Sequence, residues 1–179
     1  MFKRIVACSS LILLTACSTF SGPKIEKEDS VTAEFMGGEI KITYTKKGEF
    51  ESMIATGSAR MIGSLPSSQE EAFTVAKIRA EQKIIEFMKI ELESDRFVKS
   101  MYDSMQDGKS YNNQTNNDVN SKIVTQVQED IKTKSKGILK GVHVESKKFD
   151  ASRNIVLVTI KTGVKEIATS KHLFNLMGN

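Results

Sequence analysis

The chain has 179 residues, which suits one domain of ordinary size with a short extension. It carries 26 Lys and Arg against 22 Asp and Glu; Lys3 and Arg4 lie in a segment that we expect to be removed, which lowers the net charge from +4 to +2. So small a positive charge argues against a nucleic-acid-binding protein, and we expect no nucleic acid among the partners.

The first twenty residues have the three zones of a secretory signal. Lys3 and Arg4 supply a positive start, residues 5–14 are mostly apolar, and small residues follow. The apolar run is too short for a membrane-spanning helix, which needs about 20 residues. Residues 14–17, Leu-Thr-Ala-Cys, resemble the lipobox of bacterial lipoproteins. The resemblance implies a lipoprotein signal peptide at 1–16, cleavage before Cys17, a diacylglycerol on its thiol and acylation of the new amino group.

Cysteine usage supports an attachment role for Cys17. The only other cysteine, Cys8, lies in the signal, so the processed chain has no disulfide and no thiolate metal site. One acyl chain binds a membrane marginally, whereas two or three hold a protein essentially permanently. In the lipoprotein class, a residue other than aspartate after the cysteine, here Ser18, implies the outer membrane. We therefore expect an outer-membrane protein, lipid-anchored and periplasmic or surface-facing.

Residues 17–33 are mostly small or charged, and we predict a lipid-anchored flexible tether. As a random coil it would reach about 20–25 Å. Gly37 and Gly38 are interpreted as the end of this tether. Residues 34–179 are predicted to form a single α+β domain.

Alternation of apolar and polar residues predicts a strand at 40–45 and a second at 50–61, where Gly57 marks a bulge or close packing. Helical spacing predicts a helix at 69–106. Because 38 residues would extend about 57 Å, this helix is expected to bend or break near 91–95.

A polar loop is predicted at 107–117, followed by a helix at 119–136 that Gly137 would end. Strands at 138–149 and 154–164 and a final helix at 165–177 complete the chain. The order ββ-α-α-ββ-α predicts an α+β fold, with a small antiparallel sheet packed on one face by two or three helices.

No constellation of chemically active residues stands out. His143 and His172 fall on different predicted elements, so we interpret both as surface or boundary residues. Carboxylates on the long helix are interleaved with lysines and arginines and indicate a solvated face. No nucleophile elbow, phosphate-binding loop or dinucleotide motif is found. We assign no catalytic, cofactor-binding or metal residues and expect a non-enzymatic protein.

The second half of the chain is rich in lysine. These side chains suit anionic lipid headgroups, a cell-wall polymer or ordinary solvent, and we favour solvent. The residues are Lys132, Lys134, Lys136, Lys140, Lys147 and Lys148.

Residues 54–87 carry a family likeness. Gly57-Ser58-Ala59 ends a strand, and alanines at 72, 76 and 80 follow in a helix. This pattern resembles the Lpp-twenty-like group of small bacterial lipoproteins, which is related to the flagellar lipoprotein FlgP, over roughly residues 50–165. The resemblance implies a non-enzymatic envelope protein, sometimes assembled into rings or oligomers. It supplies no catalytic residues.

The sequence thus favours a cell-envelope lipoprotein that acts through protein–protein contacts or oligomeric assembly. Its expected partners are the membrane, through acyl chains on Cys17, and envelope proteins, including further copies in a homo-oligomer. The alternative is a periplasmic module that binds cell wall or a small ligand. A hydrolase with an unfamiliar site is the third and least favoured interpretation.

Overall fold

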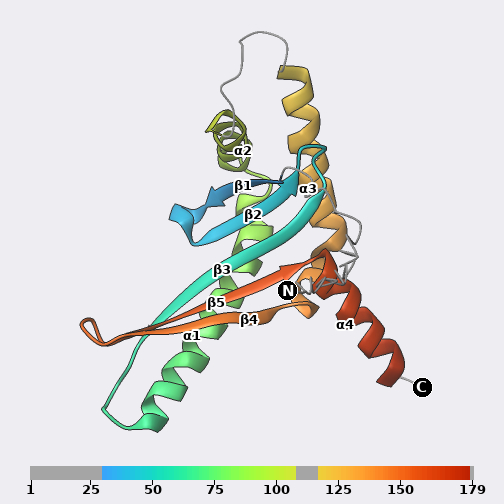
Figure 1. Ribbon diagram of the computed structural model, residues 1–179. Helices are drawn as coiled ribbons and strands as arrows, with labels where there is room; N and C mark the ends of the chain where they lie inside the picture. Colours follow the sequence, from blue (N-terminus) through green and yellow to red (C-terminus); the bar gives the residue numbers. More distant parts are fainter. Residues whose placement is uncertain (1–29, 108–116, 178–179) are drawn as a thin grey trace, which may run out of the picture.

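The structure, a computed structural model, describes residues 30–107 and 117–177 (Figure 1). A 3-10 turn at Met36–Gly38 links the first two strands, and a π-helical turn at Phe87–Glu91 follows the first helix. The strands and helices are, in chain order, β1 (Ser30–Phe35), β2 (Ile40–Thr45), β3 (Phe50–Arg60), α1 (Pro66–Glu86), α2 (Asp95–Asp107), α3 (Asn117–Lys140), β4 (His143–Asp150), β5 (Ile155–Gly163) and α4 (Val164–Met177).

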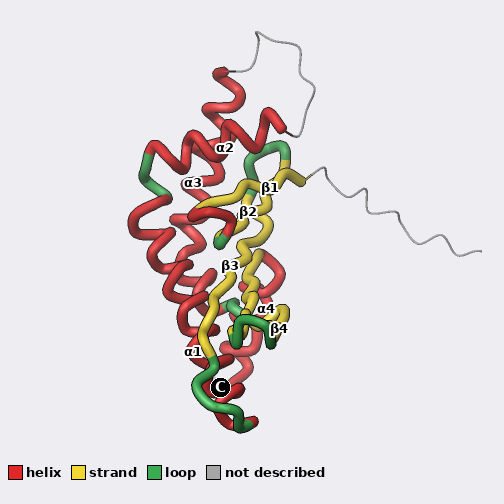
Figure 2. The backbone as a smooth tube through the Cα atoms, turned by 90° about the vertical axis from the view of Figure 1, so that its left-hand side faces the viewer, coloured by secondary structure: helices red, strands yellow, loops and turns green. Residues whose placement is uncertain are grey.

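The five strands form one antiparallel sheet in the order β1-β2-β3-β5-β4. Alternate residues of β2, β3 and β5 are buried against the helices, and those between them are more exposed. Helix α1 runs along the buried face, while α2 crosses β1 (Figures 1 and 2). The predicted α+β class and antiparallel pairing are confirmed.

Small residues bring α1 unusually close to the sheet. Ala55, Gly57 and Ala59 of β3 face the helix, where Ala76 and Ala80 are fully buried. A Cβ atom on Gly57 would lie 2.6 Å from the backbone nitrogen of Ala80 and would also overlap the carbonyl oxygen of Ala76. Gly57 therefore marks close packing of strand on helix, one of its two expected roles.

Aromatic rings fill the core where α2 meets β1. The ring centre of Phe35 lies 5.1 Å from that of Phe87 and 5.3 Å from that of Phe97. Nearby, the hydroxyl groups of Tyr44 and Ser104 are 2.9 Å apart and join β2 to α2. These contacts hold α2, the helix that follows the π-helical turn, against β1 and β2.

The long predicted helix breaks as expected. α1 ends at Glu86 and α2 begins at Asp95, so the chain changes direction close to residues 91–95. The prediction that Gly137 ends the next helix was wrong, because α3 continues to Lys140. Gly137 instead makes room for α4: a Cβ there would lie 2.7 Å from Cγ2 of Ile167. The strand expected from residue 138 consequently begins at His143.

The predicted tether, 17–33, extends too far toward the C-terminus. The sheet is also larger than expected. Residues 30–33 belong to β1, and Gly37 and Gly38 form the turn into β2 with φ of +68° and +86°. The observed order is βββ-ααα-ββ-α instead of ββ-α-α-ββ-α. Cys17, the predicted signal at 1–16 and the tether up to residue 29 lie outside the described residues, as does most of the predicted loop, 108–116.

Candidate functional site

The strand register places the start of β1 and the end of β5 at one end of the sheet. Ser30 pairs with Thr45 of β2, and Gly163 pairs with Ser52, near the start of β3. We call this the proximal end. Helix α4 starts here, directly after Gly163, and runs away from the sheet (Figure 1). The distal end is the opposite one, where Arg60 pairs with Ile155.

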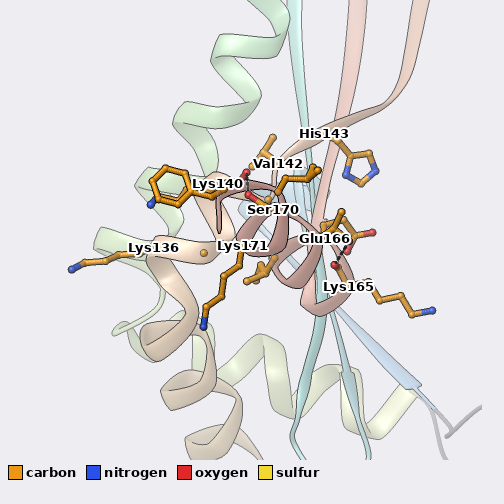
Figure 3. A pocket seen from close by; sticks show the side chains of 14 residues that line it. Lys136, Lys140, Val142, His143, Lys165, Glu166, Ser170 and Lys171 are labelled. Carbon is orange, nitrogen blue, oxygen red and sulfur yellow. Dashed lines mark hydrogen bonds between the residues drawn. The ribbon is translucent and has the colours of Figure 1, made fainter. Parts of the chain in front are cut away.

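A groove of about 1030 Å³ lies at the proximal end, between the last turn of α3, the start of β4 and helix α4 (Figure 3). Its basic side chains come from two helices: Lys136 and Lys140 from α3, and Lys165 and Lys171 from α4. Glu166 is its acidic side chain. The apolar part of the wall consists of Val142, Ile167, Leu173 and Phe174.

The first half of α4 is held firmly against α3. Glycines in α3 and after it allow the contact, because a Cβ on Gly141 would lie 3.0 Å from the backbone nitrogen of Ile167. The Ser170 hydroxyl donates a hydrogen bond of 3.1 Å to the carbonyl oxygen of Lys140. The ammonium group of Lys140 lies 5.3 Å from the ring centre of Phe174, a cation–π distance. These contacts fix the direction in which α4 leaves the sheet.

The second half of α4 is largely uncovered. Leu173, Phe174 and Leu176 expose 51%, 67% and 64% of their surface. Three large apolar residues exposed within four positions are unusual for a soluble surface, and such groups mark interaction sites. We call these three residues the α4 tip.

Several lysines of the second half of the chain are paired with carboxylates. Lys132 lies 2.8 Å from Glu93, and Lys134 lies 2.6 Å from Asp130. Lys147 lies 3.6 Å from the carboxylate of Glu70 in α1. A hydrogen bond from Lys132, together with its charge, lowers the pKa of Glu93. In contrast, the four groove lysines have no ion-pair partner within residues 30–107 and 117–177. The groove therefore carries an excess of positive charge, with four lysines against one glutamate.

The two histidines are both exposed. His143 lies at the start of β4 and lines the groove, while His172 lies on α4. Among the described residues, no three His, Cys, Asp or Glu side chains are grouped so that they would hold a metal ion. Ser170 directs its hydroxyl at a backbone carbonyl and not at His143. The groove thus offers cationic and apolar contacts to a ligand, and its described hydrogen bonds do not activate a nucleophile.

Sequence reasoning missed this site. It assigned Lys136 and Lys140 to a solvated surface and gave the last helix, 165–177, no role in a site. The available signal was the placement of Lys165 and Lys171 on the same short helix as Leu173, Phe174 and Leu176. Only the packing of α4 on α3 brings the two pairs of lysines together.

Comparisons of the chain with protein-family models, with curated proteins and with solved structures find no match. Across the described residues, no helix has both the length and the apolar character needed to cross a membrane.

Proposed function

We propose that this protein is a non-enzymatic lipoprotein of the bacterial outer membrane, anchored by acyl chains on Cys17, whose folded domain acts through contacts with other envelope proteins. The observation that carries the proposal is the Leu-Thr-Ala-Cys sequence at residues 14–17, which directly follows a basic start and an apolar run. Membership of the Lpp-twenty-like group of lipoproteins is part of the same proposal.

The position of the fold in the chain supports anchoring. Only the twelve residues 18–29 separate the predicted lipid site, Cys17, from β1, which begins at Ser30. Such a segment has an end-to-end distance of about 20 Å as a random coil. A domain anchored through Cys17 would therefore stay close to the membrane, with its proximal end nearest the attachment point.

Exposed apolar residues at the distal end support a protein contact. Ile62 and Leu65, in the connection between β3 and α1, expose 86% and 65% of their surface, and Phe149 at the end of β4 is also exposed. We call these three the distal residues, and they lie at the opposite end of the sheet from α4 (Figure 1). In an anchored protein they would point toward possible partners, including other copies.

The β4 edge of the sheet is less suited to a partner strand. It has an irregular register between Val144 and Ser146, and it carries Lys147 and Lys148. Bulges and edge lysines are features that prevent edge-to-edge pairing. These features favour the distal residues over the β4 edge as the protein contact.

Lipidation is tested by growing cells with an alkyne-bearing palmitate and detecting label on the protein. We expect label on the native chain and on Cys8→Ala, and none on Cys17→Ala. Because Cys8 and Cys17 are the only cysteines, this pair of variants separates lipidation of Cys17 from any general reaction of thiols. Equal labelling of the native chain and Cys17→Ala would contradict the anchor.

The protein contact is tested by placing a photo-crosslinking amino acid at position 62 in intact cells. We expect a discrete crosslinked species that is lost in a Leu65→Asp background. Position 99, an exposed lysine of α2, is the matched control. If position 62 gives no crosslinked species that is absent at position 99, the proposed contact is wrong.

The alternative function, binding of cell wall or a small ligand, is favoured by the groove with its four lysines. Purified peptidoglycan distinguishes it: retention that falls when Lys136 and Lys140 are changed to glutamine would support a cell-wall module. No retention would count against it.

A further inference from the structure

The α4 tip and the groove lysines together have the composition of a membrane-surface site. An interfacial helix buries apolar side chains at the boundary of the acyl region and places lysines among the headgroups. We propose that the α4 tip and the groove dock on an anionic phospholipid surface, that of the same membrane in which Cys17 is anchored. This inference rests on the proposed function, because the tether supplies the membrane.

Charge complementarity identifies the lipid as anionic. Lys136, Lys140, Lys165 and Lys171 border the groove with Glu166 as its acid, and these lysines lack ion-pair partners within residues 30–107 and 117–177. Each lysine close to an anionic bilayer strengthens binding about fivefold. Phosphate groups of lipids would supply the negative charge that the described protein surface does not.

The topology brings this site to the membrane. Ser30, where the tether joins the sheet, and Gly163, where α4 begins, are separated by three strand spacings across β2 and β3. Three spacings amount to about 15 Å. Helix α4 has 14 residues and is about 21 Å long. As a random coil the tether would span about 20 Å, a matching length, so the α4 tip would reach the bilayer surface while the anchor remains in the same membrane.

A second copy of the chain suits this surface less well. A symmetric contact presents the same patch on both subunits. Pairing one α4 tip with another would therefore bring the four groove lysines of each copy together, with one glutamate each to offset them. Repulsion between these like charges disfavours such a contact, whereas the lysines are attracted to an anionic bilayer.

Tryptophan fluorescence provides a direct test, since the chain contains no tryptophan. The variant Phe174→Trp places a single reporter on the α4 tip, and Ile62→Trp places one at the distal end as the matched control. Full-length lipidated protein is purified from membranes and reconstituted into phosphatidylcholine vesicles, with or without phosphatidylglycerol. Flotation reports anchoring, and quenching by lipids brominated in their acyl chains reports insertion of the reporter.

We expect the emission of the Phe174→Trp protein to shift to shorter wavelength and to be quenched by brominated lipid when phosphatidylglycerol is present. The emission of the Ile62→Trp protein should not depend on phosphatidylglycerol, and brominated lipid should not quench it. Adding Lys165→Gln and Lys171→Gln should reduce the ratio of docked to undocked protein about 25-fold, from two factors of about five. The control pair Lys99→Gln and Lys122→Gln, which removes the same charge from α2 and α3, should leave it unchanged.

The outcomes separate the two proposals. If the protein floats with the vesicles and the Phe174→Trp reporter behaves like the Ile62→Trp reporter, anchoring stands and the docking site is wrong. A shift without quenching that grows with protein concentration would show that another copy covers α4, which also overturns docking on lipid. Failure to float in every preparation would overturn the anchoring itself, and the docking proposal with it.

Discussion

Replacing Gly57 with alanine adds one methyl group at the closest contact between the sheet and α1. The new Cβ would lie 2.6 Å from the backbone nitrogen of Ala80 and would overlap the carbonyl oxygen of Ala76. Neither obstacle can rotate away, since both are backbone atoms of a helix, and so the helix must shift. Overpacking of this kind costs about 1–3 kcal/mol, partly offset by the 0.4–1 kcal/mol or so that alanine gains by restricting the unfolded chain.

We expect an overpacking cost near the upper end of that range, because the added atom meets main chain that cannot rotate away, and therefore a net loss of about 2 kcal/mol. In a domain of this size the loss corresponds to a melting temperature lower by about 4–8 °C. Urea unfolding followed by circular dichroism gives the free energy of unfolding.

The matched control is Ser58→Thr, which adds one methyl on the exposed side of the same strand. We expect it to change stability by less than about 0.5 kcal/mol. If Gly57→Ala is as stable as Ser58→Thr, the close approach of α1 to β3 is wrong.

Two further predictions concern the part of the core around α2. Phe97→Ala should lower the free energy of unfolding in urea by about 3–5 kcal/mol, because the buried ring of Phe97 stacks on that of Phe35. Val98→Ala, on the exposed side of α2, should lower it much less. Equal losses in the two variants would contradict the position of α2. Burial raises the pKa of Tyr44, although its hydrogen bond with Ser104 opposes the rise. The folded state therefore holds the phenol proton more tightly than the unfolded state, and this stability is full below about pH 10 and lost as the pH rises through the folded pKa. Tyr44→Phe should make the urea midpoint less sensitive to pH between about 9 and 11, and an unchanged pH dependence would refute the assignment.

The sequence predicted most elements whose pattern is local. The strand at 40–45 follows from short-range periodicity, and the break in the long helix follows from its length; both are present. The sequence also indicated close packing as one of two roles for Gly57, which faces the alanines at 76 and 80. The register that places them face to face depends on pairing of β3 with β5, which no local pattern specifies.

Strand β1, which the sequence did not predict, shows where reasoning from local patterns failed. Val31, Ala33 and Phe35 alternate with polar residues, yet the nearby charged residues and Gly37 and Gly38 made the segment resemble a tether. Pairing with β2 and burial of Phe35 against Phe87 and Phe97 decide its structure.

The groove could not be found from the sequence for a similar reason. Lys136 and Lys171 are 35 positions apart, and only the packing of α4 on Gly137 and Gly141 brings them to one site. The mistaken end of α3 at Gly137 concealed this contact. Gly137 lies inside α3 and allows α4 to pack closely; it does not end α3.

The central claim is that Cys17 carries the lipid anchor, and intact-mass spectrometry of the protein extracted from cell membranes tests it most directly. The account predicts a chain that begins at Cys17, with a diacylglycerol and an amide-linked acyl group that fragmentation places on that residue. A chain that begins at Met1, or one in which Cys17 is unmodified, would contradict it.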